Sequence, residues 1–220
     1  MSFCLSVTGE FACFTRPEMK VERVSYDVIT PSSARSIFEA ILWKPAIQWH
    51  VYKIEVLKPI RWVNIRRNEV GAVLPVGNIK KAMNGGALPA LYVEEARQQR
   101  AGLFLRDVSY RIHAHFSLTA KAGPSDNAGK FVEMFKRRAR KGQCFNQPYL
   151  GCREFSCEFQ LEEAPDQAQP AAITETKQLG WMLYDMDYTN SAEASPLFFN
   201  ASMQDGVINV PDRNSEEVRG

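Results

Sequence analysis

The sequence predicts an α+β fold, in which an N-terminal sheet packs on two helices and a small antiparallel β domain follows. Strand-like and helical periodicities alternate over residues 1–144 in the order strand, helix, strand, excursion, strand and helix. From residue 145 the pattern changes to short strands separated by turn residues. The order of elements over residues 1–144 is compatible with a βαββαβ ferredoxin-like sandwich. Because the pattern then changes, we expect two domains, at residues 1–144 and 145–220.

A strand, a helix and a second strand open the chain. Apolar residues alternate with polar ones from Phe3 to Val7, which predicts a half-buried strand that continues past a bulge at Gly9. A helix is predicted to begin at Ser32, its N-cap, and to end before Pro45, because a proline disfavours helical geometry in the preceding residue. Residues 46–57 are rich in β-branched and aromatic types, as in a strand.

A basic excursion precedes the clearest strand. Residues 61–89 are basic and then rich in Gly and Pro, which predicts a β-hairpin or a flexible excursion outside the core. Residues 108–118 alternate regularly, with Arg111, His113 and His115 on the polar face. The histidines are two residues apart, about 7 Å along the strand. Three interpretations remain open: a hydrogen-bonded surface pair, an RNA contact beside Arg111, or a metal site that needs further ligands.

The segment "DNAGKFVEMFKRRARKGQ" (126–143) predicts a basic amphipathic helix ending at Gly142. It has six basic and two acidic side chains. The apolar arc comprises Phe131, Val132, Met134, Phe135 and Ala139, interrupted by Arg138, while Lys130, Lys136, Arg137, Arg140 and Lys141 project away. Within the helix only Glu133 could pair with these cations, so intrahelical ion pairs do not account for them. The alternatives are a solvated face and a phosphate-binding face, and we favour phosphate.

The remaining sequence predicts a loop and a hairpin. Residues 162–174 have the composition of a surface loop, and 179–188 and 195–211 are predicted to be strands, with a hairpin turn at Asp205-Gly206.

Charge is sorted along the chain. Residues 1–153 hold 24 basic and 12 acidic side chains, a net of +12, whereas residues 154–220 hold 3 and 13, a net of −10. Such asymmetry indicates that the N-terminal part meets a polyanion. We expect neither a transmembrane helix nor a signal peptide, and five cysteines without CxxC spacing predict free thiols in a cytoplasmic protein, with no metal or other cofactor.

Common enzyme and RNA-binding motifs are missing from the sequence. Walker, GxGxxG, GxSxG and HExxH motifs do not occur, nor does the aromatic octapeptide of RRM domains. A ferredoxin-like (RRM-like) RNA binder would therefore have to hold RNA by something other than stacking on its sheet.

Several blocks resemble one known family: "SYDVITPSSARSIFEAILWKP", "RRNEVG", "RQQRAGLFLRDVSYRIHAHF", "DNAGKFVEMFKRRARKGQ" and "LGCREF". They resemble, in order and over nearly the whole chain, the D-type members of the fifth CRISPR-associated protein family. These are the repeat-RNA-processing endoribonucleases of subtype I-C (Dvulg-type) systems. The resemblance implies a ferredoxin-like domain with a protruding hairpin and a small C-terminal β-sheet domain. It also implies metal-independent cutting of precursor CRISPR RNA at the repeat hairpin, and retention of the 5′ handle within the interference complex.

The family's functional positions carry over only in part. A tyrosine before Trp-Lys-Pro and a Lys-His pair after a glycine are implied, but this chain has Leu42 at the first position and Lys130-Phe131 at the pair. The lysine matches, whereas Leu42 and Phe131 cannot transfer protons. We expect RNA contacts from the following basic residues: Arg66, Arg67, Arg100, Arg111, Lys136, Arg137, Arg140 and Lys141.

Three alternatives follow from the missing tyrosine and histidine. Other groups could replace them, and the candidates by residue type are Tyr26, His50, His113 and His115. Lys130 and the basic helix could instead cleave slowly through charge and orientation. The chain could also be a non-catalytic scaffold subunit that binds the RNA handle. We favour retained processing. A protein that binds or nicks duplex DNA with the same basic surface is a further alternative.

Overall fold

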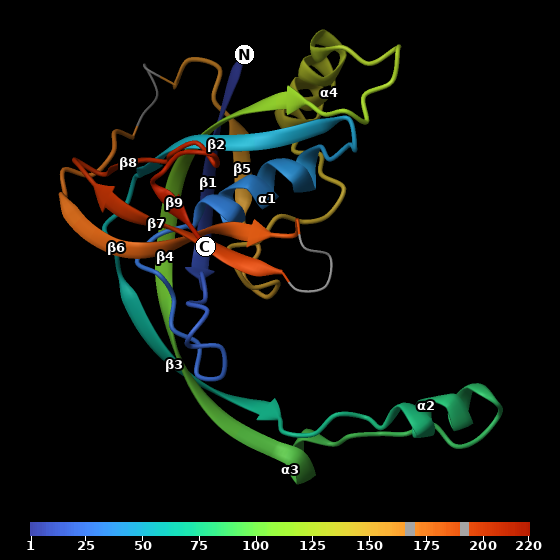
Figure 1. The fold of residues 1–220 in the computed structure, drawn as a ribbon. Helices are drawn as coiled ribbons and strands as arrows, with labels where there is room; N and C mark the ends of the chain where they lie inside the picture. Colours follow the sequence, from blue (N-terminus) through green and yellow to red (C-terminus); the bar gives the residue numbers. More distant parts are fainter. Residues whose placement is uncertain (166–169, 190–193) are drawn as a thin grey trace.

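The computed structural model describes residues 1–165, 170–189 and 194–220 (Figure 1). Its elements are β1 (Ser2–Ala12), α1 (Pro31–Ile41), β2 (Ile47–Val56), β3 (Trp62–Val70), α2 (Val76–Met83), α3 (Val93–Ala96), β4 (Arg97–Leu118), α4 (Ala128–Arg140), β5 (Glu158–Leu161), β6 (Lys177–Asp187), β7 (Ser195–Met203), β8 (Val207–Asn209) and β9 (Val218–Arg219). Within these residues no helix has the length and apolar character needed to cross a bilayer.

The main sheet confirms the predicted α+β fold and its ferredoxin-like order. Its strands lie in the order β5-β1-β4-β2-β8 and are all antiparallel, with β3 pairing to β4 beside this path. The predicted βαββαβ unit therefore consists of β1, α1, β2, β4, α4 and β5.

The central strand β4 is much longer than the predicted 108–118 segment. Its 22 residues, about 70 Å of strand, pair with β3 over their first part and with β1 and β2 over the rest. The β3–β4 ribbon thus forms an arm that leaves the main sheet and carries α2 and α3 at its far end (Figure 1). Where the arm joins the sheet, Asp107 has a left-handed φ of 53° and accepts a hydrogen bond from Lys58.

Capping residues mark the start of α1 and the end of α4. The Thr30 hydroxyl accepts a hydrogen bond from the Ser33 amide at 3.3 Å, so the prediction of Ser32 as the cap is wrong; Pro31 occupies the first helical turn instead. α1 ends at Ile41, before the predicted limit at Pro45, because Leu42 is already extended. α4 ends as predicted, with Gly142 at a φ of +63°.

An aromatic cluster fixes α1 and α4 to one face of the main sheet. The Phe135 ring of α4 lies 4.8 Å from both Phe3 of β1 and Trp49 of β2, and 5.6 Å from Phe38 of α1. These are ordinary distances for interacting aromatic pairs. The two helices are therefore joined to each other and to the sheet through a single buried ring.

The C-terminal residues contribute to two sheets. β6, β7 and β9 form a small antiparallel sheet, as predicted, but β5 and β8 belong to the main sheet. A boundary at residue 144 therefore cuts through the main sheet. Of the predicted 162–174 loop, residues 166–169 lie outside the described part of the chain.

The predicted Asp205-Gly206 hairpin turn is present, closed by an antiparallel bridge in which the amides of Gln204 and Val207 each donate to the other's carbonyl at 2.9 Å, but the hairpin does not extend beyond this pair. Both residues have positive φ, 48° and 73°, as a tight turn requires. The strands on either side pair elsewhere, β7 with β6 and β9, and β8 with β2. The turn therefore carries the chain from the small sheet to the edge of the main one.

Truncation of the central ring should destabilise the fold strongly. Phe135 is 0% exposed, so Phe135→Ala should lower the free energy of unfolding by about 3–5 kcal/mol, measured by chemical denaturation. Phe145→Ala is the matched control, because that side chain is 84% exposed. Equal unfolding midpoints for the two variants would contradict the assigned core.

Candidate functional site

Lys130 lies in the first turn of α4, where the helix N-terminus adds positive potential. The Asn127 side chain caps the helix by accepting a hydrogen bond from the Lys130 amide at 2.9 Å. The Lys130 ammonium lies 2.8 Å from an Asp126 carboxylate oxygen. The hydrogen bond from Lys130, and a second from the Gly123 amide, hold the pKa of Asp126 below its usual range. A phosphate at this site would have to compete with the Asp126 carboxylate for the ammonium.

Leu42 and Phe131 belong to the core. Both side chains are buried, and Phe131 meets the Phe116 ring edge-on at 6.3 Å. The Leu42 carbonyl accepts a hydrogen bond from the Trp49 indole nitrogen at 2.9 Å. The two positions that the resemblance assigns to proton transfer are thus occupied by packing residues.

The histidines lie on the opposite side of the sheet from Lys130. Phe116 faces α4, and side chains alternate along a strand, so His115 points to the other face. His50 is the register partner of His115, and their rings stack with centroids 5.2 Å apart. The His50 ring is also 2.8 Å from the Ser117 hydroxyl. The structure does not bring this histidine pair together with Lys130.

His113 and Arg111 form a buried ionic network around Glu55. The carboxylate of Glu55 lies 2.5 Å from the Arg111 guanidinium, 2.7 Å from the His113 imidazole and 2.9 Å from the Lys53 ammonium. Arg111 also donates to the Pro170 carbonyl at 2.8 Å. The predicted polar face of this strand is therefore covered here, and Arg111 is not on the surface where RNA would meet it. In the described ranges no group of three or more His, Cys, Asp or Glu side chains is arranged to hold a metal ion.

Tyr26, the remaining substitute candidate, is also buried and lies near the other end of β4. Its neighbour Ser25 bonds to Leu103, 15 residues before the end of β4 and about 50 Å along the strand. Burial raises the pKa of the Tyr26 hydroxyl. None of the four substitute candidates lies with Lys130 in the described structure.

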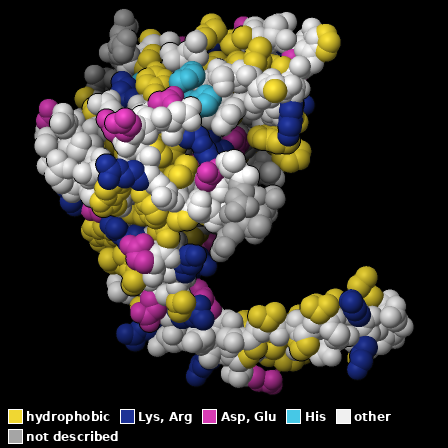
Figure 2. Space-filling model, viewed as in Figure 1, with side chains coloured by type: hydrophobic (Ala, Val, Ile, Leu, Met, Phe, Trp, Pro, Cys, Tyr) yellow, Lys and Arg dark blue, Asp and Glu magenta, His cyan; other side chains and the backbone are white. Residues whose placement is uncertain are grey.

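Apart from the buried Arg111, the predicted RNA-binding cations fall into two groups at opposite ends of β4. Arg66, Arg67 and Arg100 lie on the arm, where basic and hydrophobic side chains share the surface (Figure 2). Arg67 and Arg100 pair with Glu69, and Arg67 also pairs with Glu154.

The second group lies on α4 and contains unpaired cations. Lys136, Arg137 and Lys141 make no ion pair within residues 1–165, 170–189 and 194–220, whereas Arg140 pairs with Glu163. These three cations, like the exposed Arg66 of the arm, which also makes no ion pair in the described ranges, are available to phosphates.

Arg138, which interrupts the apolar arc, connects the two helices. Its guanidinium donates to the Ile41 carbonyl at 2.9 Å, so it satisfies an otherwise open group at the C-terminal end of α1. The amide of Phe145, just after α4, likewise donates to the Ala40 carbonyl at 2.7 Å.

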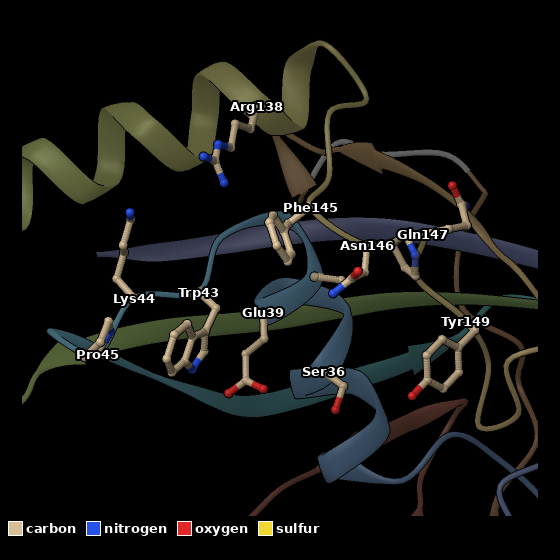
Figure 3. A pocket seen from close by; sticks show the side chains of 12 residues that line it. Ser36, Glu39, Trp43, Lys44, Pro45, Arg138, Phe145, Asn146, Gln147 and Tyr149 are labelled. Atoms are coloured by element: carbon tan, nitrogen blue, oxygen red, sulfur yellow. The ribbon is translucent and has the colours of Figure 1, made fainter. Parts of the chain in front are cut away.

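Between these contacts lies a pocket of about 550 Å³, hereafter the α1–α4 pocket (Figure 3). It is lined by Ser36, Glu39, Ala40, Trp43, Lys44, Pro45, Arg138, Phe145, Asn146, Gln147, Pro148 and Tyr149. Sequence patterns do not predict this site, because its aromatic and amide groups come from irregular segments that have no periodic pattern. The exposed Trp-Lys-Pro at the end of α1 was the available signal.

The ferredoxin-like sheet, the long arm and the unpaired cations of α4 define a ferredoxin-like protein with a surface suited to a polyanion. A family model described as a CRISPR-associated protein (Cas_Cas5) matches residues 2–211. A protein of Mannheimia succiniciproducens is 51% identical over 98% of this chain and 97% of its own length. One of Thermus thermophilus is 39% identical over 97% of this chain and 93% of its own length. Both relatives are named CRISPR pre-crRNA endoribonuclease Cas5d. This chain therefore belongs to the Cas5d family of CRISPR-associated proteins.

Two solved structures share the fold at low sequence identity. One, described as the crystal structure of a CRISPR-associated protein, has a TM-score of 0.72 at 21% identity. The other, a functionally uncharacterized protein of Streptococcus mutans, has a TM-score of 0.69 at 20% identity. Each comparison covers 100% of this chain and 97% of the other.

Acidification should destabilise the protein through the Glu55 network. Burial opposes ionisation of Glu55, but hydrogen bonds from Lys53, Arg111 and His113 outweigh it and keep the Glu55 pKa below its usual value. Burial and the nearby Lys53 charge lower the pKa of His113. In both cases the unfolded chain binds more protons than the folded one, so stability is present above the ordinary pKa values and is lost as pH falls.

The free energy of unfolding should therefore decrease between about pH 7.5 and about pH 5.5, where an unfolded histidine becomes protonated. Denaturation at a series of pH values measures this. His113→Gln keeps a hydrogen-bond donor but does not titrate, so its dependence should be shallower. Identical pH dependence in the two proteins would show that His113 is not the sensitive group.

Proposed function

We propose that this chain is an endoribonuclease that cuts precursor CRISPR RNA at the repeat hairpin. In this proposal it keeps the 5′ handle of the product and is a subunit of the subtype I-C interference complex. The observation that carries the proposal is the 51% identity, over nearly the full length of both chains, to a relative named CRISPR pre-crRNA endoribonuclease.

The proposed reaction uses a nucleophile that RNA itself supplies. The 2′-oxygen loses its proton and bonds to the adjacent phosphorus, while the bond from phosphorus to the 5′-oxygen breaks and that oxygen takes up a proton. The products are a 2′,3′-cyclic phosphate and a 5′-hydroxyl. Lys130 would stabilise the charge that accumulates on the phosphate, assisted by the N-terminus of α4.

The positions of the other side chains limit how protons can move. Leu42 and Phe131 are buried and apolar, and the sheet separates the histidines from Lys130. We therefore propose that this chain cleaves mainly by orienting the RNA and by charge stabilisation, two effects that supply several kcal/mol in other enzymes. Proton transfer to and from solvent water would complete the reaction.

The burial of Leu42 and Phe131 at the two proton-transfer positions favours a second candidate function. A chain with packing residues at both proton-transfer positions could bind the handle without cutting it. Incubation of the purified protein with repeat RNA in EDTA distinguishes the two. One product with a 2′,3′-cyclic phosphate supports the enzyme, intact but shifted RNA supports the scaffold, and preferential binding of duplex DNA would contradict both.

Reversal of the unpaired α4 charges should weaken RNA binding. Arg137→Glu with Lys141→Glu should raise the Kd for repeat RNA and flatten its salt dependence by up to about one unit of slope for each phosphate that the helix no longer binds. Lys20→Glu with Arg219→Glu is the control, since it makes the same change in net charge away from α4. If both double variants lose affinity equally, only net charge matters and the α4 surface is not the binding site.

Removal of the Lys130 ammonium should slow cleavage more than binding. Lys130→Ala should reduce the single-turnover rate by about 10²-fold, as expected when one charged group that stabilises the transition state is removed, with little change in Kd. Lys177→Ala is a close match, because both ammonium groups pair with an aspartate and are similarly exposed, 45% for Lys130 and 41% for Lys177.

The control should cut at the wild-type rate. Suppose instead that Lys130→Ala cuts at the wild-type rate and that His50→Ala, His113→Ala or His115→Ala abolishes cleavage. The active site would then lie on the other face of the sheet, and the assignment of Lys130 would be wrong.

A further inference from the structure

The α1–α4 pocket exposes two large aromatic rings to solvent. Trp43 is 62% exposed and Phe145 is 84% exposed. Figure 3 shows these rings at neighbouring positions along the pocket, with Glu39 of α1 below them and Asn146 beside Phe145. Exposed aromatic faces that adjoin polar groups are typical of surfaces on which single-stranded nucleic acids stack their bases.

The pocket walls are held in place by hydrogen bonds. The Phe145 amide and the Arg138 guanidinium both donate to carbonyls at the end of α1, at 2.7 and 2.9 Å. The Gln147 amide group donates to the Cys157 carbonyl at 2.9 Å. The segment after α4 is thus fixed against α1 without a ligand, so a ligand would not have to order it.

The polar groups of the pocket match a nucleotide. The Asn146 side chain makes no hydrogen bond within the described part of the chain, and an amide offers both a donor and an acceptor to a base edge. Lys44, exposed at the rim, makes no ion pair in the same described ranges and could meet a phosphate. The volume of about 550 Å³ lies within the usual range for small-molecule sites, about 300–1,000 Å³.

The pocket and Lys130 share one helix. Arg138 of the pocket is eight residues beyond Lys130, about 12 Å along α4. Lys44 also relates the two sites. It lines the pocket, and its charge helps to lower the pKa of Asp126, the ion-pair partner of Lys130.

We propose that the α1–α4 pocket binds one unpaired nucleotide of the RNA, with its base stacked on Trp43 and Phe145 and its phosphate on Lys44. The base edge would meet Asn146, and the bound nucleotide would set which phosphate lies at Lys130. This inference rests on the proposed function, because it takes repeat RNA as the ligand.

Abasic substitution of the RNA tests the pocket directly. Each unpaired nucleotide next to the repeat hairpin is replaced in turn by an abasic one, in RNA whose 2′-methoxy groups prevent cleavage. Fluorescence anisotropy then gives the Kd. At one position the wild type should bind about 10-fold more weakly, as expected for one stacked base. Trp43→Ala should weaken binding of intact RNA by a similar factor, and the abasic change at that position should then have no further effect.

Controls separate the pocket from general effects. Trp181→Ala, at an exposed tryptophan of β6, should keep the wild-type Kd. Because Trp43 and Phe145 are exposed, their alanine variants should keep the wild-type thermal midpoint.

The inference is overturned if Trp43→Ala and Phe145→Ala bind intact RNA like the wild type. It is also overturned if they respond to every abasic position as the wild type does, or if they lose only binding to a protein subunit. Failure of the wild type to bind repeat RNA at all would overturn the proposed function, and the inference with it.

Discussion

The packing of α1 and α4 on the main sheet is the constraint on which the rest of the structure depends. Phe135 joins both helices to β1 and β2 through one buried aromatic cluster. That packing places Arg138 beside the end of α1 and opens the α1–α4 pocket between the helices. It also explains Leu42 and Phe131, since side chains at these positions face inward and contribute to the cluster rather than to chemistry.

The two faces of the main sheet have different roles. One face holds the apolar core and the helices, with the unpaired cations of α4 on their outer side. The other face buries Glu55, whose charge is compensated by Arg111 and Lys53 and whose carboxylate also contacts the His113 imidazole. Removing one partner of such a network is costly, because it leaves an uncompensated buried charge. We therefore assign the histidine face mainly to structure and the helix face to RNA.

Local patterns predicted most of the fold, whereas the site depended on contacts between distant residues. Period-two alternation found residues 108–118, and apolar spacing found α4 and its end at Gly142. Residues 97–102 of β4 were missed because they pair with β3 on the arm and most of them are exposed or half-buried, so their sequence need not alternate. The burial of Arg111 could not be predicted, since Glu55 lies 56 residues away in the sequence. Lys130 was assigned a catalytic role only through the family resemblance. Neither the local patterns nor that resemblance predicted the α1–α4 pocket.

The face of the sheet on which RNA binds is the most direct test of these assignments. Ultraviolet cross-linking of repeat RNA, followed by mass spectrometry of the linked peptides, locates the bound RNA. We predict cross-links within α4 and at Trp43 and Phe145, on the helix side of the sheet. Cross-links concentrated at His50, Tyr52 and His115 would place the RNA on the opposite face and contradict this assignment.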